Sequence, residues 1–136
     1  MAQLLSGIRV LDLTTVLAGP FAAYQLGLFG AEIIKIEIPG TGDLAREIGT
    51  ESPLHTPMMG ASFLAQNAGK RSITLNLKNE KAREVFERLV RSADVLVENM
   101  RPGVLERLGF PWARLHEINP ELVYCAISVF GQTGPM

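Results

Sequence analysis

The sequence predicts an α/β fold: a Rossmann-like, mostly parallel sheet with flanking helices. Short apolar segments typical of strands occur five times along the chain, and helical patterns separate most of them. Parallel strands need crossover connections of this kind. With 136 residues and 47% hydrophobic content, the chain is also long enough for one domain with its own core.

The first predicted strand spans residues 9–13, and a Thr-rich loop over residues 14–20 follows it. Pro20 suits the first turn of a helix, where its missing N–H would have no partner anyway. We expect this helix to end at Gly30, because glycine adopts the backbone conformation that closes helices. A second strand is predicted at residues 32–36 from its alternating apolar side chains.

The stretch over residues 39–70 is rich in Gly and Pro, and we expect it to contain no regular element. Loops of this length are usually functional or mobile. Alternation predicts a third strand at residues 72–77. Asn79 is a suitable N-cap for the next helix, in which apolar side chains recur at three- and four-residue spacing up to Ala93.

The last part of the chain contains the fourth and fifth predicted strands, at residues 94–98 and 122–128. Between them we expect two short helices, one over residues 104–108 and one beginning at Pro111. The second helix must end by Asn119, because a residue before proline is disfavoured in the helical conformation. We also expect Phe110 and Trp112, on either side of Pro111, to lie in the core.

Composition argues against several classes of protein. Thirteen basic and fourteen acidic residues give a formal charge of −1, and no basic run suggests a nucleic-acid or membrane partner. The apolar stretch over residues 16–29 is interrupted by glycines and a proline and is shorter than the roughly 20 residues that span a bilayer. No secretory signal is recognisable, and the single Cys125 fits a reducing compartment. We therefore expect a cytoplasmic protein.

Two further motifs do not indicate a binding site. Residues 40–45 match the dinucleotide pattern G-x-G-x-x-A, but neither a continuous helix nor an acidic strand end follows at the required distance. His55 and His116 have no partners at metal-ligand spacing, so no metal site is expected.

Ligands of parallel α/β sheets bind beyond the carboxyl ends of the strands. This rule selects four loops, over residues 14–20, 77–79, 99–103 and 128–135. In the first loop, the backbone amides of Leu17 and Ala18 lie near the positive end of a helix, which favours a phosphate group.

Candidate side chains follow the third and fourth strands. Lys78 lies on the carboxyl side of the third strand. Asn99, Met100 and Arg101 combine an amide, an adaptable apolar group and a guanidinium, which binds phosphate through two parallel hydrogen bonds. Arg107 follows about one helical turn later. For either arginine taken alone, a solvated surface role is the more ordinary explanation.

Taken together, these segments resemble the N-terminal part of the class III coenzyme A transferases. That family includes formyl-CoA and carnitinyl-CoA transferases and the related α-methylacyl-CoA racemases. The matching segments occur in the family's order at residues 9–13, 18–20, 28–37, 42–43, 67, 70–73, 93–99, 101–103, 107–109, 119–120 and 131–135.

The resemblance implies a coenzyme A site, with coenzyme A or acyl-CoA as substrate and no permanently bound cofactor. Backbone groups of Leu17 and Ala18 would contact the ligand. The implied adenosine end involves Leu75, Asn76, Leu77 and Lys78, and the implied nucleotide and phosphate contacts involve Asn99, Met100, Arg101 and Arg107. Ile38 departs from family members that carry arginine there, which removes one phosphate contact.

The resemblance also implies that the reacting group is absent. In the family an aspartate attacks the acyl-CoA thioester and then carries coenzyme A as an aspartyl thioester, which divides one hard exchange into easier steps. That aspartate, and the histidine of the racemases, follow the motif at residues 131–135. None of Asp12, Asp43 and Asp94 matches it.

Residues 1–136 thus correspond to the N-terminal part of the large coenzyme-A-binding domain, without the small domain and the C-terminal return segment. We expect a fragment that is inactive alone, marginally stable and exposes apolar surface, whereas the full-length protein would be a homodimer. Three hypotheses remain open: a transferase acting on an acyl-CoA and a carboxylic acid, a racemase, and an inert coenzyme-A-binding remnant. The acyl group and the acceptor acid are not identified.

Overall fold

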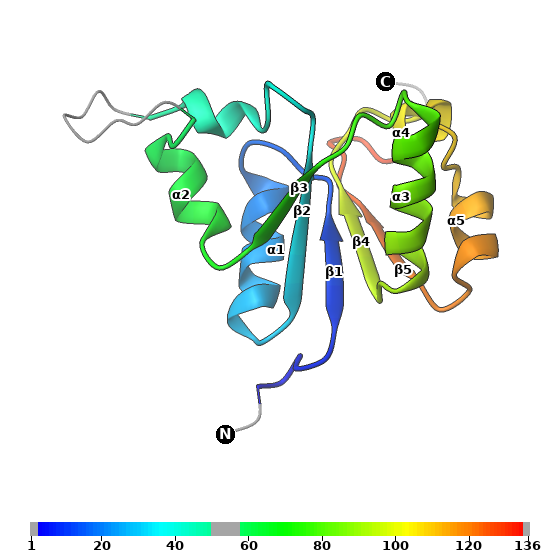
Figure 1. Ribbon diagram of the computed structural model, residues 1–136, viewed down its shortest axis with the longest axis horizontal. Helices are drawn as coiled ribbons and strands as arrows, with labels where there is room; N and C mark the ends of the chain where they lie inside the picture. The colour runs from blue at the N-terminus through cyan, green and yellow to red at the C-terminus, as the bar shows by residue number, and fades with distance from the viewer. Residues whose placement is uncertain (1–2, 50–57, 135–136) are drawn as a thin grey trace.

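The protein is a five-stranded parallel sheet covered by helices on both faces (Figure 1). The computed structural model describes residues 3–49 and 58–134. The strands are β1 (Arg9–Asp12), β2 (Glu32–Glu37), β3 (Arg71–Thr74), β4 (Val95–Glu98) and β5 (Val123–Ala126). The helices are α1 (Ala18–Leu28), the 3₁₀ helix η1 (Leu44–Glu47), α2 (Ala61–Asn67), α3 (Glu80–Arg91), α4 (Val104–Arg107) and α5 (Trp112–Ile118). The predicted fold class is confirmed.

The strand order is β3-β2-β1-β4-β5, and every neighbouring pair is parallel. The chain moves outward from β1 to β3 and then crosses back to add β4 and β5 on the other side of β1. The connections at the carboxyl ends of β1 and β4 therefore leave in opposite directions. Such a switch point opens a crevice where parallel sheets bind their ligands.

Two apolar clusters hold the layers together. On one face of the sheet, Leu11 and Leu96 pack with Phe86 of α3 and Leu115 of α5. The rings of Phe86 and Phe110 meet edge to face, with centroids 4.6 Å apart, a favoured aromatic geometry. On the opposite face, a smaller cluster joins α1 to the sheet through Val10, Ala23, Ile33 and Val97.

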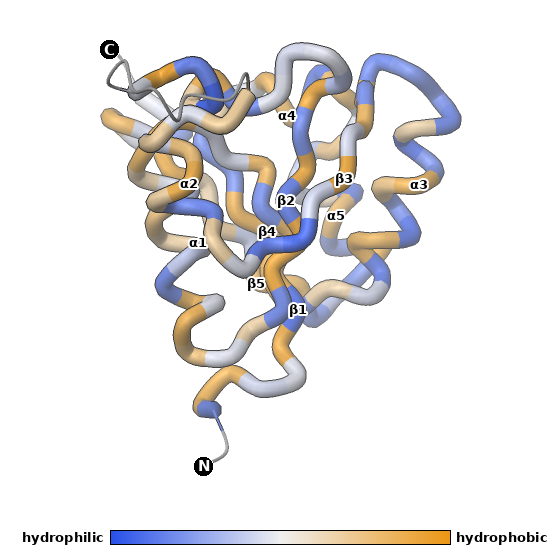
Figure 2. Tube along the Cα trace, turned by 60° about the vertical axis from the view of Figure 1, so that its left-hand side comes forward, coloured by the Kyte–Doolittle hydropathy of each residue, from blue (hydrophilic) through white to orange (hydrophobic). Residues whose placement is uncertain are grey.

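The two main helices differ in composition. Helix α1 is apolar along most of its length, whereas polar and apolar residues alternate in α3 (Figure 2). The predicted cap of α3 is confirmed: the Asn79 side chain accepts a hydrogen bond of 2.9 Å from the Lys81 N–H. This bond satisfies one of the amide groups that a helix start leaves without a partner.

The expectation that residues 39–70 contain no regular element is wrong, because η1 and α2 lie within that stretch. Helix α2 is only seven residues long, so it is held by tertiary contacts more than by periodicity. The Arg46 guanidinium of η1 lies 3.6 Å from the centre of the Phe63 ring in α2. Residues 50–57, including His55, lie outside the described part of the chain.

Smaller differences concern strand lengths and one aromatic side chain. The third strand ends at Thr74, where its pairing with β2 ends, although Leu77 is still buried in the core. The fifth strand is likewise shorter than predicted. Phe110 lies in the core as expected, but the expectation for Trp112 is wrong, because 48% of that residue is exposed. Among the described residues, no helix is long and apolar enough to cross a bilayer.

Candidate ligand-binding site

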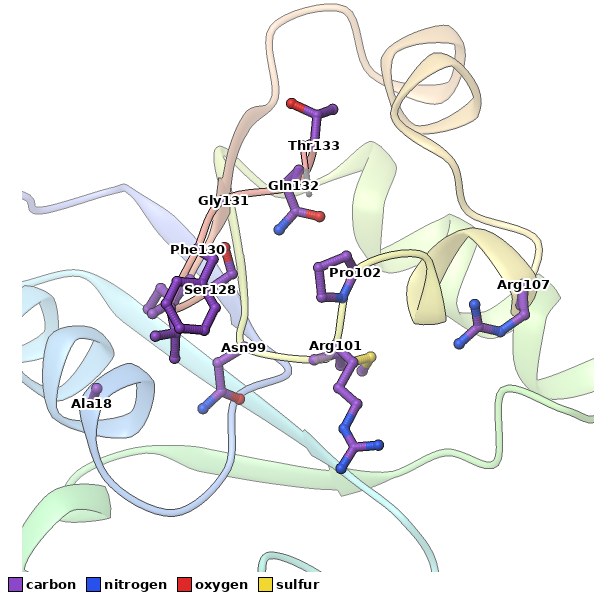
Figure 3. Close-up of a pocket in the computed structure, with 14 residues that line it drawn as sticks. Ala18, Asn99, Arg101, Pro102, Arg107, Ser128, Phe130, Gly131, Gln132 and Thr133 are labelled. Carbon is purple, nitrogen blue, oxygen red and sulfur yellow. The ribbon is translucent and has the colours of Figure 1, made fainter. Parts of the chain in front are cut away.

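A cavity of about 910 Å³ lies at the carboxyl ends of β4 and β5, beside the start of α1 (Figure 3). Its wall combines guanidinium and amide groups with apolar side chains. The lining residues are Ala18, Asn99, Met100, Arg101, Pro102, Arg107, Ile127, Ser128, Val129, Phe130, Gly131, Gln132, Thr133 and Gly134. The cavity therefore lies at the switch point of the sheet, where the strand order predicts a ligand.

The structure brings half of the predicted site residues to this wall. Ala18, Asn99, Met100, Arg101 and Arg107 all line the cavity. They come from α1, from the loop after β4 and from α4, so segments far apart in the sequence meet here. The wall thus unites three of the regions that the sequence selected.

Leu17 and the segment over residues 75–78 are not on the cavity wall. Leu17 directly precedes Ala18 and is 62% exposed. Asn76 and Lys78 form a turn beyond β3, in which the Asn76 side chain accepts from the Lys78 N–H at 3.2 Å, and Leu77 is buried in the core. Residues 75–78 lead from the end of β3 to the start of α3, and Leu75 and Leu77 pack in the same apolar cluster as Met100 of the cavity wall.

The Asn99 amide joins the loops after β1 and β4. Its Oδ1 accepts from the Thr15 N–H at 2.9 Å, and its Nδ2 donates to the Thr15 carbonyl at 2.8 Å. Both polar atoms of the side chain are thus bound to backbone 84 residues away in sequence. Asn99 fixes the width of the crevice between the two loops.

The two arginines of the wall are exposed cations. Within residues 3–49 and 58–134, neither Arg101 nor Arg107 forms an ion pair. Both side chains project from the segment that follows β4 (Figure 3). Two guanidinium groups without acidic partners at the edge of one cavity favour an anionic ligand with phosphate or carboxylate groups.

Glu98 fixes the loop that carries Met100 and Arg101. Its buried carboxylate accepts from the Met100 N–H at 2.6 Å and from the Tyr124 hydroxyl at 2.8 Å. Burial, with the hydrogen bond to the Glu98 carboxylate, raises the pKa of the Tyr124 hydroxyl above its usual range. Tyr124 therefore stays protonated and keeps donating to Glu98 at any physiological pH.

Sequence reasoning selected the loop over residues 128–135 but named no site residue in it. The structure places residues 128–134 on the cavity wall, with Val129 87% and Phe130 75% exposed. Exposed apolar side chains beside two arginines suit a ligand that has both an apolar part and charged groups. The position of this loop after a strand indicated that it could contact a ligand, but no residue type in it indicated which residue would do so. Pro135 lies outside the described residues.

The dinucleotide-like motif at residues 40–45 has a different role. Asp43 is buried, caps η1 through the Ala45 N–H and pairs with Lys35, so no helix of the dinucleotide-binding kind begins here. In the described part of the chain, no three His, Cys, Asp or Glu side chains form a metal-binding group.

Fold and cavity define an α/β protein with an anion-favouring site at the switch point of its sheet. The model of the family described as CoA-transferase family III matches residues 5–136, and the chain belongs to this family.

Curated relatives include the formyl-CoA:oxalate CoA-transferase of Rhodopseudomonas palustris (strain HaA2), 47% identical over 131 residues, which are 96% of this chain and 30% of that protein. The acetyl-CoA:oxalate CoA-transferase of Acetobacter aceti is 50% identical over 133 residues, covering 96% of this chain and 32% of the relative. The beta subunit of the succinyl-CoA–L-malate CoA-transferase of Chloroflexus aurantiacus is 44% identical, with coverage of 96% and 32%. The chain spans about a third of the length of these relatives.

Solved structures show the same fold. Rv3272 from Mycobacterium tuberculosis, in an orthorhombic crystal form, superposes with a TM-score of 0.90 at 42% identity, over 98% of this chain and 37% of that one. A CAIB/BAIF family protein from Brucella suis superposes with a TM-score of 0.90 at 41% identity, over 99% of this chain and 36% of that one. The resemblance to class III coenzyme A transferases is confirmed.

Proposed function

We propose that this chain supplies the coenzyme-A-binding part of an enzyme that moves coenzyme A between an acyl-CoA and a carboxylic acid. One observation carries the proposal: the cavity at the switch point is bordered by Arg101 and Arg107, exposed and without ion pairs in the described chain. Membership of CoA-transferase family III supports it, as do the relatives, which are named as CoA-transferases. Those names favour transfer over the racemase hypothesis.

The cavity wall suggests how coenzyme A binds. Arg101 and Arg107 contact the phosphates, because a guanidinium forms paired hydrogen bonds with phosphate oxygens. Phe130 and Ile127 pack against the less polar pantetheine arm. The N–H groups of Leu17 and Ala18 donate to the ligand near the start of α1, and residues 75–78 form the adenosine end.

The attacking carboxylate comes, in this proposal, from residues outside this chain. The aspartates of the described residues are already engaged: Asp12 with Lys70 at 2.7 Å and Asp43 with Lys35 at 2.9 Å, all with buried side chains. Asp94 accepts from the Arg9 N–H at 2.7 Å, at the amino ends of the strands and away from the cavity. A nucleophile must lie exposed beside the thioester; Asp12 and Asp43 are buried in ion pairs and Asp94 lies at the opposite edge of the sheet.

In the proposed reaction, an aspartate oxygen bonds to the acyl carbon while the coenzyme A thiolate leaves, which gives a mixed anhydride. The thiolate then attacks the aspartyl carbonyl, releases the first carboxylic acid and forms the aspartyl-CoA thioester. The acceptor carboxylate attacks this thioester, and the thiolate finally takes the acceptor's acyl group and frees the aspartate. This chain binds the nucleotide throughout, so that the thiolate stays near both carbonyl carbons.

We further propose that the full-length protein is a cytoplasmic homodimer that needs no resident cofactor, with residues 1–136 forming the N-terminal part of its large domain. The single cysteine, Cys125, supports a reducing compartment. Sedimentation of the full-length protein tests the assembly, and a monomer that retains full activity would contradict it.

Titration of coenzyme A into the purified chain by calorimetry tests the binding proposal. Arg101→Ala and Arg107→Ala are each expected to weaken binding roughly tenfold or more, because each removes charge-assisted hydrogen bonds. Arg88→Ala is the matched control, since Arg88 is an exposed arginine on α3 away from the cavity. Lys78→Ala reports whether the ligand reaches the turn after β3. Equal affinities for all variants would contradict the assigned site.

Turnover tests the reaction. The isolated chain is expected to produce no acyl exchange from formyl-CoA and oxalate, whereas the full-length protein produces it. Uptake of deuterium at the α-carbon of a chiral acyl-CoA in deuterated water, without any acceptor acid, would contradict the transferase proposal and indicate a racemase.

A further inference from the structure

The loop that leads from β1 into α1 contains a strained residue. Val16 has φ of 71°, in the left-handed region that β-branched residues avoid. Such a conformation costs free energy and persists only where the surroundings determine it. Val16 directly precedes Leu17 and Ala18, whose N–H groups the proposed function assigns to the ligand.

Four side chains hold this loop. Oδ1 of Asp12 accepts from the Thr14 N–H at 2.9 Å, and Nζ of Lys35 donates to the Thr14 carbonyl at 2.8 Å. Asn99 binds both polar backbone groups of Thr15, as described above. Oδ1 of Asp43 accepts from the Val16 N–H at 2.9 Å.

Backbone N–H groups of this loop up to Val16 are hydrogen-bonded within the described part of the chain, whereas those directly after it are not. Every N–H from Thr14 to Val16 donates to a side chain of the protein. Within the described residues, the N–H groups of Leu17 and Ala18 have no protein acceptor. The first N–H groups of every helix lack intrahelical acceptors, so these two donors at the start of α1 are available to an anion.

Asp43 and Lys35 form one buried unit under the loop. The side chains are 0% and 1% exposed, and Nζ and Oδ2 are 2.9 Å apart. Burial alone would raise the pKa of the Asp43 carboxyl, but Lys35 and the N–H groups of Val16 and Ala45 more than offset it, so the pKa lies below its ordinary value. Asp43 is therefore a fixed anion.

The backbone of Asp43 is also held in place, by Glu37. Its own N–H donates to Oε2 of Glu37 at 2.8 Å, and Glu37 in turn accepts from Arg46 at 2.7 Å. Glu37 belongs to β2, so the position of Asp43 is tied to the sheet. Removing two buried charges together often leaves stability unchanged or improved. Stability alone therefore does not explain why a buried pair lies under this loop.

We propose that the Lys35–Asp43 pair is a positioning device that holds Val16 in its left-handed conformation and so directs the N–H groups of Leu17 and Ala18 toward the ligand. Asp43 acts through the Val16 N–H, and Lys35 acts through the Thr14 carbonyl. This inference rests on the proposed function, because it takes coenzyme A as the ligand. Neither residue lines the cavity, so both act through the loop.

The test replaces both charges at once with Lys35→Met/Asp43→Leu, which leaves no unpaired buried charge. Urea unfolding is expected to show a chain that still folds cooperatively but is less stable, because the N–H groups of Val16 and Ala45 and the Thr14 carbonyl lose their partners. Coenzyme A affinity, measured by calorimetry, is expected to fall at least tenfold, because the two free amides lose their fixed direction. Unchanged affinity in the folded double variant would overturn the proposal.

A matched control removes an ion pair elsewhere in the sheet. Arg9→Gln/Glu32→Gln breaks a 2.7 Å pair between β1 and β2 at their amino ends, far from the loop. This variant is expected to bind coenzyme A as the unmodified chain does. An equal loss of affinity in this control would overturn a specific role for Lys35 and Asp43.

A third substitution tests the action through Val16. Glycine adopts φ near 71° without steric cost, so adding Val16→Gly to the Lys35→Met/Asp43→Leu chain is expected to recover part of the lost affinity. No recovery would show that the pair does not act through Val16 and would overturn the proposal.

Amide hydrogen exchange separates this inference from the proposed function. The Val16 N–H is expected to exchange at least tenfold faster in Lys35→Met/Asp43→Leu, while amides of β1 keep their protection. If the unmodified chain bound no coenzyme A, the proposed function would fail, and the exchange rate would still decide whether the pair holds the loop. Unchanged protection of Val16 would overturn the positioning role.

Discussion

Asn99 shows how one side chain can serve a site without being free to touch the ligand. The resemblance implied a nucleotide contact for this residue, yet both polar atoms of its amide are bound to the Thr15 backbone. The ligand contact remains a prediction, whereas the link between two loops is a feature of the structure. An Asn at a strand end can contact a ligand or bind the backbone of a neighbouring loop, and only the tertiary structure shows which of the two it does.

Asn99→Ala is expected to destabilise the chain by about 0.5–1.5 kcal/mol, because the exposed N–H and carbonyl of Thr15 exchange their side-chain partner for water. Urea unfolding followed by circular dichroism measures the change. Asn99→Asp serves as control: it keeps an acceptor for the Thr15 N–H but loses the donor, so an intermediate loss is expected. A stability of Asn99→Ala equal to that of the unmodified chain would show that the loop contacts contribute nothing.

At the scale of elements, helices α3 and α2 differ in what determines them. Helix α3 has a cap, a regular apolar face and twelve residues, all visible in the sequence. Helix α2 has seven residues and depends on Arg46 over the Phe63 ring and on burial of Phe63, Gln66 and Asn67. Local pattern therefore predicted the first helix and missed the second.

The cap of α3 provides a test at this scale. Asn79→Ala is expected to cost about 1 kcal/mol of stability, because the Lys81 N–H loses its acceptor at the helix start. Thermal unfolding measures the loss. Asn79→Ser retains a capping oxygen and is expected to remain near the unmodified value, and an equal loss in both variants would contradict the capping role.

At the scale of the whole molecule, buried carboxylates make stability depend on pH. Burial alone would raise the pKa of Glu37, but hydrogen bonds from Arg46, the Asp43 N–H and Ser72 lower it from 4.5 to about 2. The pKa of Asp43 is also lowered. The unfolded chain therefore binds these protons more tightly than the folded chain does, so the stabilisation is present at neutral pH and is lost in acid.

Acid unfolding measures this linkage. The Glu37 shift corresponds to a contribution on the order of 3 kcal/mol at neutral pH, which is expected to disappear progressively as pH falls from 4.5 toward 2. Urea unfolding at a series of pH values follows the loss. Glu37→Gln is expected to be less stable at neutral pH and to lose less stability in acid. Parallel pH profiles for both proteins would contradict the assignment.

The exposed apolar surface is a second property of the whole molecule. Val123 on β5 is 61% exposed, and the Val129 and Phe130 side chains extend the apolar surface beyond the strand. Exposed apolar side chains on an edge strand promote association. We expect the isolated chain to self-associate as its concentration rises. Sedimentation velocity measures this, Val123→Thr is expected to weaken it, and a strictly monomeric chain would contradict the expectation.

The sequence alone determined the parallel sheet, the limits of α3, the loops at the strand ends and the family, because these depend on local periodicity, caps and motifs. Only the tertiary structure decided which charges are buried together. Lys70 meets Asp12 across 58 positions of sequence, and Lys35 meets Asp43 under the strained Val16. The tertiary structure also left residues 75–78 off the cavity wall, although Leu75 and Leu77 pack in the same apolar cluster as Met100 of that wall. Side-chain pairing and strand order depend on which segments fold against one another, and no local pattern specifies that.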